Sequence, residues 1–118
     1  MSFGMYQASV PAFLAMLKNL TAILDKAEAY AAECKIEPEV LLNWRLAPDM
    51  LPLTRQIQIA ADFAKGTTAR LAGAEVPKYA DDEKSFAELK ARIAKTVKFV
   101  EGLAPKDIDG SESRDIML

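Results

Sequence analysis

Apolar residues recur along residues 10–34 with spacings that alternate between three and four. This spacing places them on one side of a helix, facing a partner element. Three more apolar residues, Leu14, Met16 and Ile23, widen the stripe, which is typical of a helix in a bundle rather than in a two-stranded coiled coil. The pattern therefore predicts a long bundle helix with its inner stripe at Val10, Phe13, Leu17, Leu20, Leu24, Ala27, Ala31 and Cys34.

The two ends of this helix carry interpretable residues. Ser9 is a plausible N-cap, and Pro11 then falls in the first turn, where its missing N–H costs little. Cys34 ends the apolar stripe, so we expect it to be buried packing rather than a reactive thiol.

Two further helices are expected in the middle of the chain. Pro38 suits the first position of a short helix, PEVLLNWRL at 38–46, which Ala47 and Pro48 end. The next helix runs from about residue 50 to residue 72, and Gly73 stops it. Its inner face is Leu53, Ile57, Ala60, Ala64, Thr67 and Leu71. Its polar residues, which we expect mostly to face water, are Arg55, Gln58, Asp62 and Lys65.

A polar connection at 74–84 leads to the third long helix, which opens with the capping box SFAE at 85–88. Gly102 and Pro105 end this helix. Its inner stripe is Phe86, Leu89, Ile93, Val97 and Val100. Its cations are interpreted as a solvated face, with Glu88 and Arg92 forming an i, i+4 pair.

Three long amphipathic helices and one short helix, joined by short links, predict an all-α antiparallel bundle. The 118 residues suit a single domain, 1–118. Four helices close such a core better than three. The fourth is therefore either missing from this chain, which would then be incomplete at its C-terminus, or supplied by a partner.

The composition of the chain limits which partners and which cellular compartment are expected. The chain is 51% hydrophobic and 27% charged, with a net charge of −2, so nucleic acid and anionic membranes are not expected partners. One cysteine cannot form an internal disulfide, which fits a reducing compartment. The N-terminus is a poor signal peptide, and the longest apolar run, at 10–17, is too short to span a bilayer. These features predict a cytoplasmic protein.

The chain contains no histidine. Histidine-activated nucleophiles and histidine-ligated metals are therefore excluded within it. The acids that a carboxylate cage would need fall mostly outside the apolar stripes, so no metal site and no cofactor are expected. These acids are Glu28, Glu33, Asp62, Glu88 and Glu101.

The stretch RLAPDMLP at 45–52 has two interpretations. Asp49 can cap the following helix, with Pro52 in the first turn. Alternatively, Arg45, Asp49 and Gln56 form a polar cluster beside Trp44 that holds a small polar ligand. An Arg45–Asp49 pair would suit either interpretation.

Three segments resemble a bacterial family of unknown function grouped with the DinB/YfiT-like four-helix bundles. They are YQASVPAFLAMLKNLTAILDKA at 6–27, LLNWRLAPDMLPLTRQIQIAADFAKG at 41–66 and FAELKARIAKTVKFVEGL at 86–103. The resemblance implies a four-helix bundle that is often homodimeric. Many superfamily members are metal-dependent enzymes with a histidine triad, which this chain cannot supply.

Three classes of function remain open, the last being a purely structural or regulatory partner protein, which predicts an apolar exposed face and no pocket. The first is a metal-free bundle protein that acts through homodimerisation or by binding a small molecule at Trp44, Arg45, Asp49 and Gln56. The second is a metal-dependent transferase or hydrolase of the DinB/YfiT-like type whose metal ligands lie outside this chain.

Overall fold

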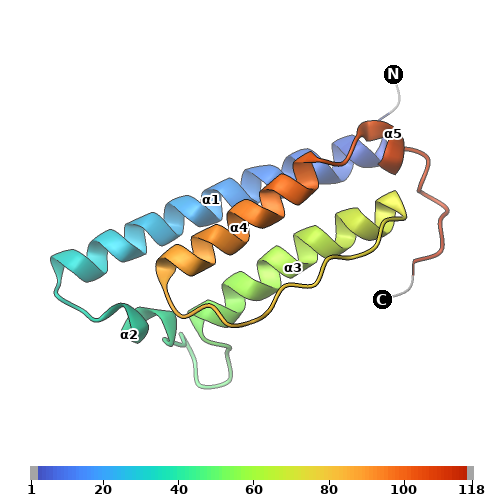
Figure 1. The fold of residues 1–118 in the computed structure, drawn as a ribbon. Coiled ribbons are helices and arrows are strands. Elements are labelled where there is room, and N and C mark those ends of the chain that lie inside the picture. Colours follow the sequence, from blue (N-terminus) through green and yellow to red (C-terminus); the bar gives the residue numbers. More distant parts are fainter. Residues whose placement is uncertain (1–2, 117–118) are drawn as a thin grey trace.

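The computed structural model describes residues 3–116, and within this range the chain is all-helical (Figure 1). The helices are α1 Met5–Glu33, α2 Pro38–Leu42, α3 Leu53–Ala72, α4 Phe86–Glu101 and α5 Pro105–Ile108. The prediction of three long helices and one short helix in an all-α fold is confirmed. The short α5 was not anticipated, because four residues are too few to show a periodic pattern.

The direction of the helices differs in one respect from a simple antiparallel bundle. α1 runs antiparallel to α3 and α4, but α3 and α4 run in the same direction (Figure 1). The packing agrees, since Ile57 near the start of α3 lies in one core cluster with Leu89 near the start of α4. The connection after α3 is therefore not a short link. It returns along the whole helix, a distance of about 30 Å for 20 residues.

The core consists of two clusters, one at each end of the bundle. The larger cluster gathers Leu17, Leu24, Leu42, Ile57, Ala64, Phe86, Leu89 and Ile93, and the smaller gathers Val10, Val100 and Ile108. α4 packs along both α1 and α3, whereas α1 and α3 meet less closely. One side of the α1–α3 pair is consequently left uncovered by the described residues.

Both ends of α1 correct the sequence-based expectation. The N-cap is Gly4, and Ser9 lies inside the helix, where its hydroxyl donates to the Met5 carbonyl at 2.7 Å. Cys34 follows the last helical residue as the C-cap and is exposed, not buried. Ala31, in the last turn, is the last buried residue of the apolar stripe.

The capping box of α4 is confirmed. Ser85 Oγ accepts a hydrogen bond from the Glu88 backbone N–H at 3.1 Å, and Glu88 Oε1 accepts from the Lys84 N–H at 3.2 Å. α3 ends at Gly73, whose φ of 69° lies in the left-handed region that favours glycine. Both helix boundaries therefore follow from local sequence.

Among the described residues, α1 is long and apolar enough to cross a membrane by length and composition alone, with a mean hydropathy of 1.2. A core helix of a soluble bundle passes the same test. Leu17 and Leu24 of α1 are buried against α3 and α4, which is the packing expected of such a helix.

Candidate functional site

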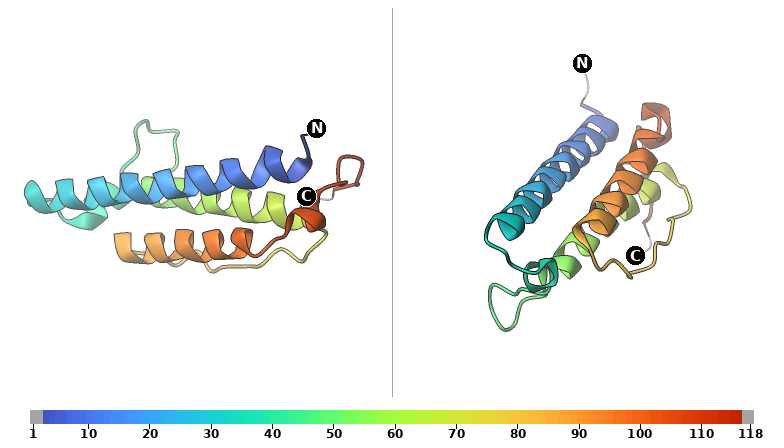
Figure 2. Two further views of the ribbon diagram at one scale, coloured as in Figure 1. Left: turned by 90° about the horizontal axis from the view of Figure 1, so that it is seen from above. Right: turned by 60° about the vertical axis from the view of Figure 1, so that its left-hand side comes forward.

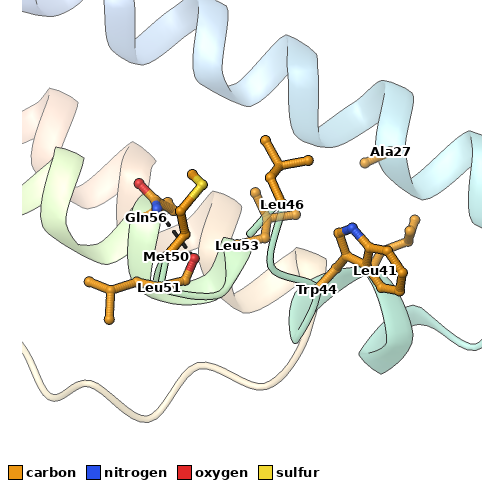
Figure 3. Close-up of a pocket in the computed structure, with 8 residues that line it drawn as sticks. All are labelled: Ala27, Leu41, Trp44, Leu46, Met50, Leu51, Leu53 and Gln56. Carbon is orange, nitrogen blue, oxygen red and sulfur yellow. Dashed lines mark hydrogen bonds between the residues drawn. The ribbon is translucent and has the colours of Figure 1, made fainter. Parts of the chain in front are cut away.

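A groove lies where the α2–α3 loop passes α1 (Figure 3). Its volume is about 390 Å³, within the range of small-molecule sites. It is lined by Ala27 of α1, Leu41 of α2, Trp44, Leu46, Met50 and Leu51 of the loop, and Leu53 and Gln56 of α3. Almost all of these side chains are apolar, so the groove suits an apolar ligand or an apolar side chain of a partner.

The loop that builds the groove starts earlier than the sequence predicts. α2 ends at Leu42, not near residue 46, so Trp44 lies in the loop. Two hydrogen bonds close the neck of this loop: the Leu53 N–H donates to the Trp44 carbonyl at 3.0 Å, and Thr54 Oγ1 donates to the Leu42 carbonyl at 3.0 Å. The closed neck holds Trp44 beside α3 and leaves its indole 61% exposed.

The structure separates the four predicted site residues. Trp44 and Gln56 line the groove, and Gln56 Nε2 donates to the Leu51 carbonyl at 3.2 Å. Arg45 and Asp49 are exposed and are not among the lining residues. No ion pair joins them within the described chain. The expected polar cluster is therefore not assembled, and ligand binding at these four residues stays a prediction.

The capping role of Asp49 is wrong. α3 begins at Leu53, its N-cap is Pro52, and no side chain caps it. The helix starts about three residues later than expected because the two prolines at 48 and 52 bracket a turn, closed by the Met50 N–H on the Ala47 carbonyl at 3.0 Å. Asp49 lies in this turn, too far from the first free N–H groups of the helix.

The uncovered side of the bundle carries large exposed apolar side chains, which we call the open face. It comprises Met16, Ile23 and Tyr30 of α1, Trp44 and Leu46 of the loop, and Phe63 of α3. The α1 members are seven residues apart, so they form one stripe along the helix. A smaller hollow of about 160 Å³ between α1 and α3, lined in part by Met16 and Ile23, lies on the same side.

A second cluster, of charged and polar residues on α3 and α4, was missed by sequence analysis. Arg92 of α4, interpreted as part of a solvated face, is only 3% exposed at its side chain. Gln58 and Lys65 of α3 are also buried, not turned to water. The reason is the connection between α3 and α4. Residues 75–84, which we call the strap, run along the α3–α4 pair (Figures 1 and 2) and contact Arg92, Gln58 and Lys65.

Arg92 is the centre of this cluster. Its Nη1 donates to Glu83 Oε1 at 2.7 Å and to the Ala80 carbonyl at 2.9 Å, and lies 2.9 Å from Asp81 Oδ1. Its Nη2 donates to Asp62 Oδ1 at 2.8 Å. The predicted pair with Glu88 is therefore replaced by partners from the strap and from α3. Of the three guanidinium nitrogens of Arg92, Nε is buried without a hydrogen-bond partner in the described structure.

Other contacts tie the strap to the helices. Gln58 Nε2 donates to Glu83 Oε1 at 3.2 Å, and Arg55 Nη1 donates to Asp81 Oδ2 at 3.1 Å. The ring of Tyr79 has the ammonium groups of Lys65 and Lys95 each 4.2 Å from its centroid. Such cation–π contacts hold an aromatic ring beside a cationic surface.

The charges of the cluster shift the pKa values of two of its members, Asp62 and Arg92. Burial alone would raise the pKa of the Asp62 carboxyl, but hydrogen bonds from Arg92 and Lys65 outweigh it and hold the pKa below its ordinary value. The pKa of Arg92 is raised, because the opposing effect of burial is outweighed by Asp62 and Glu83. Asp62 and Arg92 are therefore both charged at neutral pH.

One sequence signal could have indicated this cluster. Three successive acids, Asp81 to Glu83, directly precede a helix whose flank carries Arg92 beside the inner-stripe residue Ile93. An arginine at the edge of an apolar stripe needs partners if anything covers it. Periodicity alone could not show that the connection would do so.

Within residues 3–116, no group of three or more His, Cys, Asp or Glu side chains is arranged to hold a metal ion. The chain also has no histidine, the commonest metal ligand. These observations leave open the alternative in which metal ligands come from outside the chain.

The architecture and the comparisons identify the class of protein. The all-helical arrangement, with α1 antiparallel to a parallel α3–α4 pair, is that of a DinB-like bundle. The chain is similar to the crystal structure of a DinB family member protein from Shewanella denitrificans at 1.83 Å resolution, with 48% identity and a TM-score of 0.83. This likeness covers 87% of the present chain and 59% of that chain. It favours a soluble protein.

The family model described as Domain of unknown function (DUF1993) matches residues 5–118, and the chain belongs to this family. The resemblance inferred from the sequence is therefore confirmed. The chain spans about three fifths of the length of the Shewanella protein. A comparison with curated proteins finds no significant match.

Proposed function

We propose that this chain is a metal-free association module, and that two copies join through the open face. The observation that supports the proposal is the gathering of large exposed apolar side chains on the α1–α3 side. Exposed apolar patches of this size on soluble proteins mark interaction sites. The protein's activity is then expressed by the assembly or by what the groove holds.

The size of the open face supports a stable dimer. Its six side chains are 54 to 84% exposed, and at about 180 Å² for each large side chain they present roughly 700 Å² per copy. Two copies would bury about 1,400 Å², within the range of specific interfaces. The largest apolar patch on an ordinary monomer is about 300–600 Å².

The shape of the face suits a two-fold contact. Met16, Ile23 and Tyr30 form a continuous stripe on α1, so the same stripe of a second copy can pack against it in an isologous interface. Phe63 and Trp44 flank this stripe from α3 and the loop and would fill its edges. Aromatic anchors of this kind carry much of the energy of protein interfaces.

A second candidate is a small apolar ligand in the groove. Its volume of about 390 Å³ and its apolar lining favour such a molecule, and Gln56 supplies one amide for orientation. This candidate keeps Trp44 and Gln56 as binding residues. It assigns no contact to Arg45 or Asp49, whose place in the site stays a prediction.

The cellular setting is part of the proposal. The bacterial relative and the single cysteine support a cytoplasmic bacterial protein. The alternative of a metal-dependent transferase or hydrolase would draw its metal ligands from outside this chain. No feature of the described residues favours it.

Light scattering after gel filtration tests the dimer. We expect a mass near twice the 12.9 kDa of one chain, with helical circular dichroism. Ile23→Lys and Phe63→Lys should each yield a folded monomer, because a charge on the open face must be desolvated in the interface. Val40→Lys is the matched control: Val40 is a half-exposed apolar residue on α2 and lies outside the open face.

The outcomes separate the candidates. A wild-type chain that is a folded, soluble monomer at high micromolar concentration would overturn the dimer. Trp44 emission, from the chain's single tryptophan, then tests the groove by titration with a medium-chain alcohol such as decanol. A saturable blue shift that is lost in Met50→Lys would support the ligand, and an unchanged spectrum would count against it.

A further inference from the structure

The strap differs from the rest of the bundle in how it is attached. Within residues 3–116, no backbone-to-backbone hydrogen bond involves residues 75–84. The segment has no helical or strand structure and lies extended along α3 and α4. What holds it is a set of side-chain contacts, namely three ion pairs of Asp81 and Glu83, cation–π contacts of Tyr79, and hydrogen bonds. A segment held in this way can leave without breaking any secondary structure.

The surface beneath the strap is cationic. Four basic side chains of α3 and α4 contact strap residues, namely Arg55, Lys65, Arg92 and Lys95. The helices offer fewer acids there: Asp62 within the cluster, and Glu88 at the end of the strap, where it caps α4. The positive charge of the helix pair is therefore balanced largely by Asp81 and Glu83 of the strap.

The contacts also define what the surface recognises. Tyr79 lies against two ammonium groups, and carboxylates follow two and four positions later at Asp81 and Glu83. Arg92 further binds a backbone carbonyl, that of Ala80, between these residues. This combination of aromatic ring, carboxylates and main-chain carbonyl is the way a peptide in extended conformation is bound.

The strap is not packed tightly against α4. A hollow of about 320 Å³ remains beside their contacts, and it is lined by Tyr79 and Glu83 of the strap and by Arg92 and Lys95 of α4, among others. The α3–α4 contact itself does not depend on the strap, because Ile57 and Ala64 pack directly with Leu89 and Ile93. The helix pair can therefore keep its core while the strap moves away.

We propose that the strap is a self-docked occupant of a peptide-binding site on α3 and α4. Once the strap leaves, the site takes an extended acidic peptide of another molecule, with an aromatic residue followed by carboxylates at the second and fourth positions. The strap then acts as an autoinhibitory segment. This site is separate from the open face, so it can be tested whatever the oligomeric state.

The test is binding of the strap sequence in trans. A fluorescein-labelled peptide EVPKYADDEK, residues 75–84, is titrated with wild-type protein and with the Asp81→Asn/Glu83→Gln variant. Fluorescence anisotropy should show binding at least tenfold tighter to the variant, because its own strap competes less well. The gain should shrink in high salt, since the contacts are ionic.

Two controls make the result specific. A peptide in which the acids at positions 81 and 83 are replaced by Asn and Gln should not bind either protein. Glu75→Gln/Asp82→Asn removes two strap charges that make no ion pair with the helices in the described structure, and it should leave affinity at the wild-type level. A folded double variant that binds the acidic peptide no better than wild type would overturn the proposal.

A milder variant and a measurement on unaltered protein guard against loss of folding. Asp81→Asn changes a half-exposed side chain and should raise peptide affinity by about threefold or more while circular dichroism stays unchanged. In wild type, trypsin should cut at Lys78 at a rate that depends little on low urea concentrations, as local opening does. Cleavage at Lys78 that follows the urea dependence of global unfolding would contradict a detachable strap.

Discussion

Replacing Glu83 by Gln should destabilise the protein more than its position in an irregular segment suggests. Glu83 is 8% exposed and lies 2.7 Å from the 3% exposed Arg92. The substitution keeps the shape and one acceptor but removes the charge. Hydrogen bonds to charged groups contribute about 1.5–3 kcal/mol, and Asp62 and Asp81 remain to balance Arg92, so we expect a loss of about 2 kcal/mol.

Removing the arginine instead should cost more. Arg92→Met takes away the buried cation together with its unpartnered Nε, and a buried unsatisfied donor costs about 1–3 kcal/mol. The side chains of Asp62 and Asp81 are 42% and 47% exposed, so water can solvate them. Glu83 keeps its hydrogen bond from Gln58. The Glu83 carboxylate nevertheless stays buried without a cation, and this outweighs the gain, so we expect a loss of about 3 kcal/mol.

The double variant Glu83→Gln/Arg92→Met measures the coupling between the two residues. If the pair acts as a unit, the double variant loses about 1 kcal/mol, well short of the roughly 5 kcal/mol expected from independent effects. Urea unfolding followed by circular dichroism is the assay, because urea does not screen charges, and a 2 kcal/mol loss lowers the midpoint by about 1 M.

Glu101→Gln is the matched control. Glu101 is an exposed carboxylate of α4, and its substitution should change stability by less than about 0.5 kcal/mol. Additive single and double variants, or a Glu83→Gln midpoint equal to that of Glu101→Gln, would refute the buried ion pair as the anchor of the strap.

Three further predictions follow from the structure. Because the pKa of Asp62 is lower in the folded chain than in the unfolded one, its contribution to stability is present above its ordinary pKa and is lost as pH falls through the folded value, so Asp62→Asn should flatten the unfolding midpoint against pH below about 4. Ser85→Ala should cost about 1 kcal/mol in urea unfolding, whereas Asp49→Ala should be nearly neutral, because Ser85 caps α4 and Asp49 caps no helix; equal losses would show that Asp49 has a role the fold does not reveal. Cys34 should react with one equivalent of 5,5′-dithiobis(2-nitrobenzoate) in native buffer at the rate seen in urea, and protection of the thiol would contradict its exposure at the end of α1.

The elements of the fold could be predicted because each depends on local sequence. The apolar stripe through Leu17 and Leu24 predicted α1, and the capping box at Ser85 predicted the first residue of α4 correctly. The direction of α4 could not be predicted, since amphipathic periodicity is the same for parallel and antiparallel neighbours. The sequence pattern extended α1 to Cys34, one residue beyond its end at Glu33. Cys34 was therefore predicted to be buried, whereas it is exposed.

The candidate sites were less predictable, for a related reason. A polar residue on the flank of a stripe is assigned to water unless a tertiary contact is known. Arg92 and Gln58 were therefore misassigned, because what covers them is an irregular segment without a periodic pattern. At the groove, Trp44 and Gln56 were identified, but Arg45 and Asp49 were grouped with them on the assumption of longer helices on both sides.

The parallel course of α3 and α4 has a consequence for how the protein folds. In an antiparallel hairpin, contacts next to the turn join residues close in sequence and the rest can zip up from there. Here every contact spans a similar separation, 30 residues in the case of Asp62 and Arg92. Closing a loop of that length costs about 3 kcal/mol before any contact forms, but doubling the length adds only about 0.6 kcal/mol. The helix pair should therefore form in one cooperative step, and a glycine–serine insertion in the strap should slow folding only slightly.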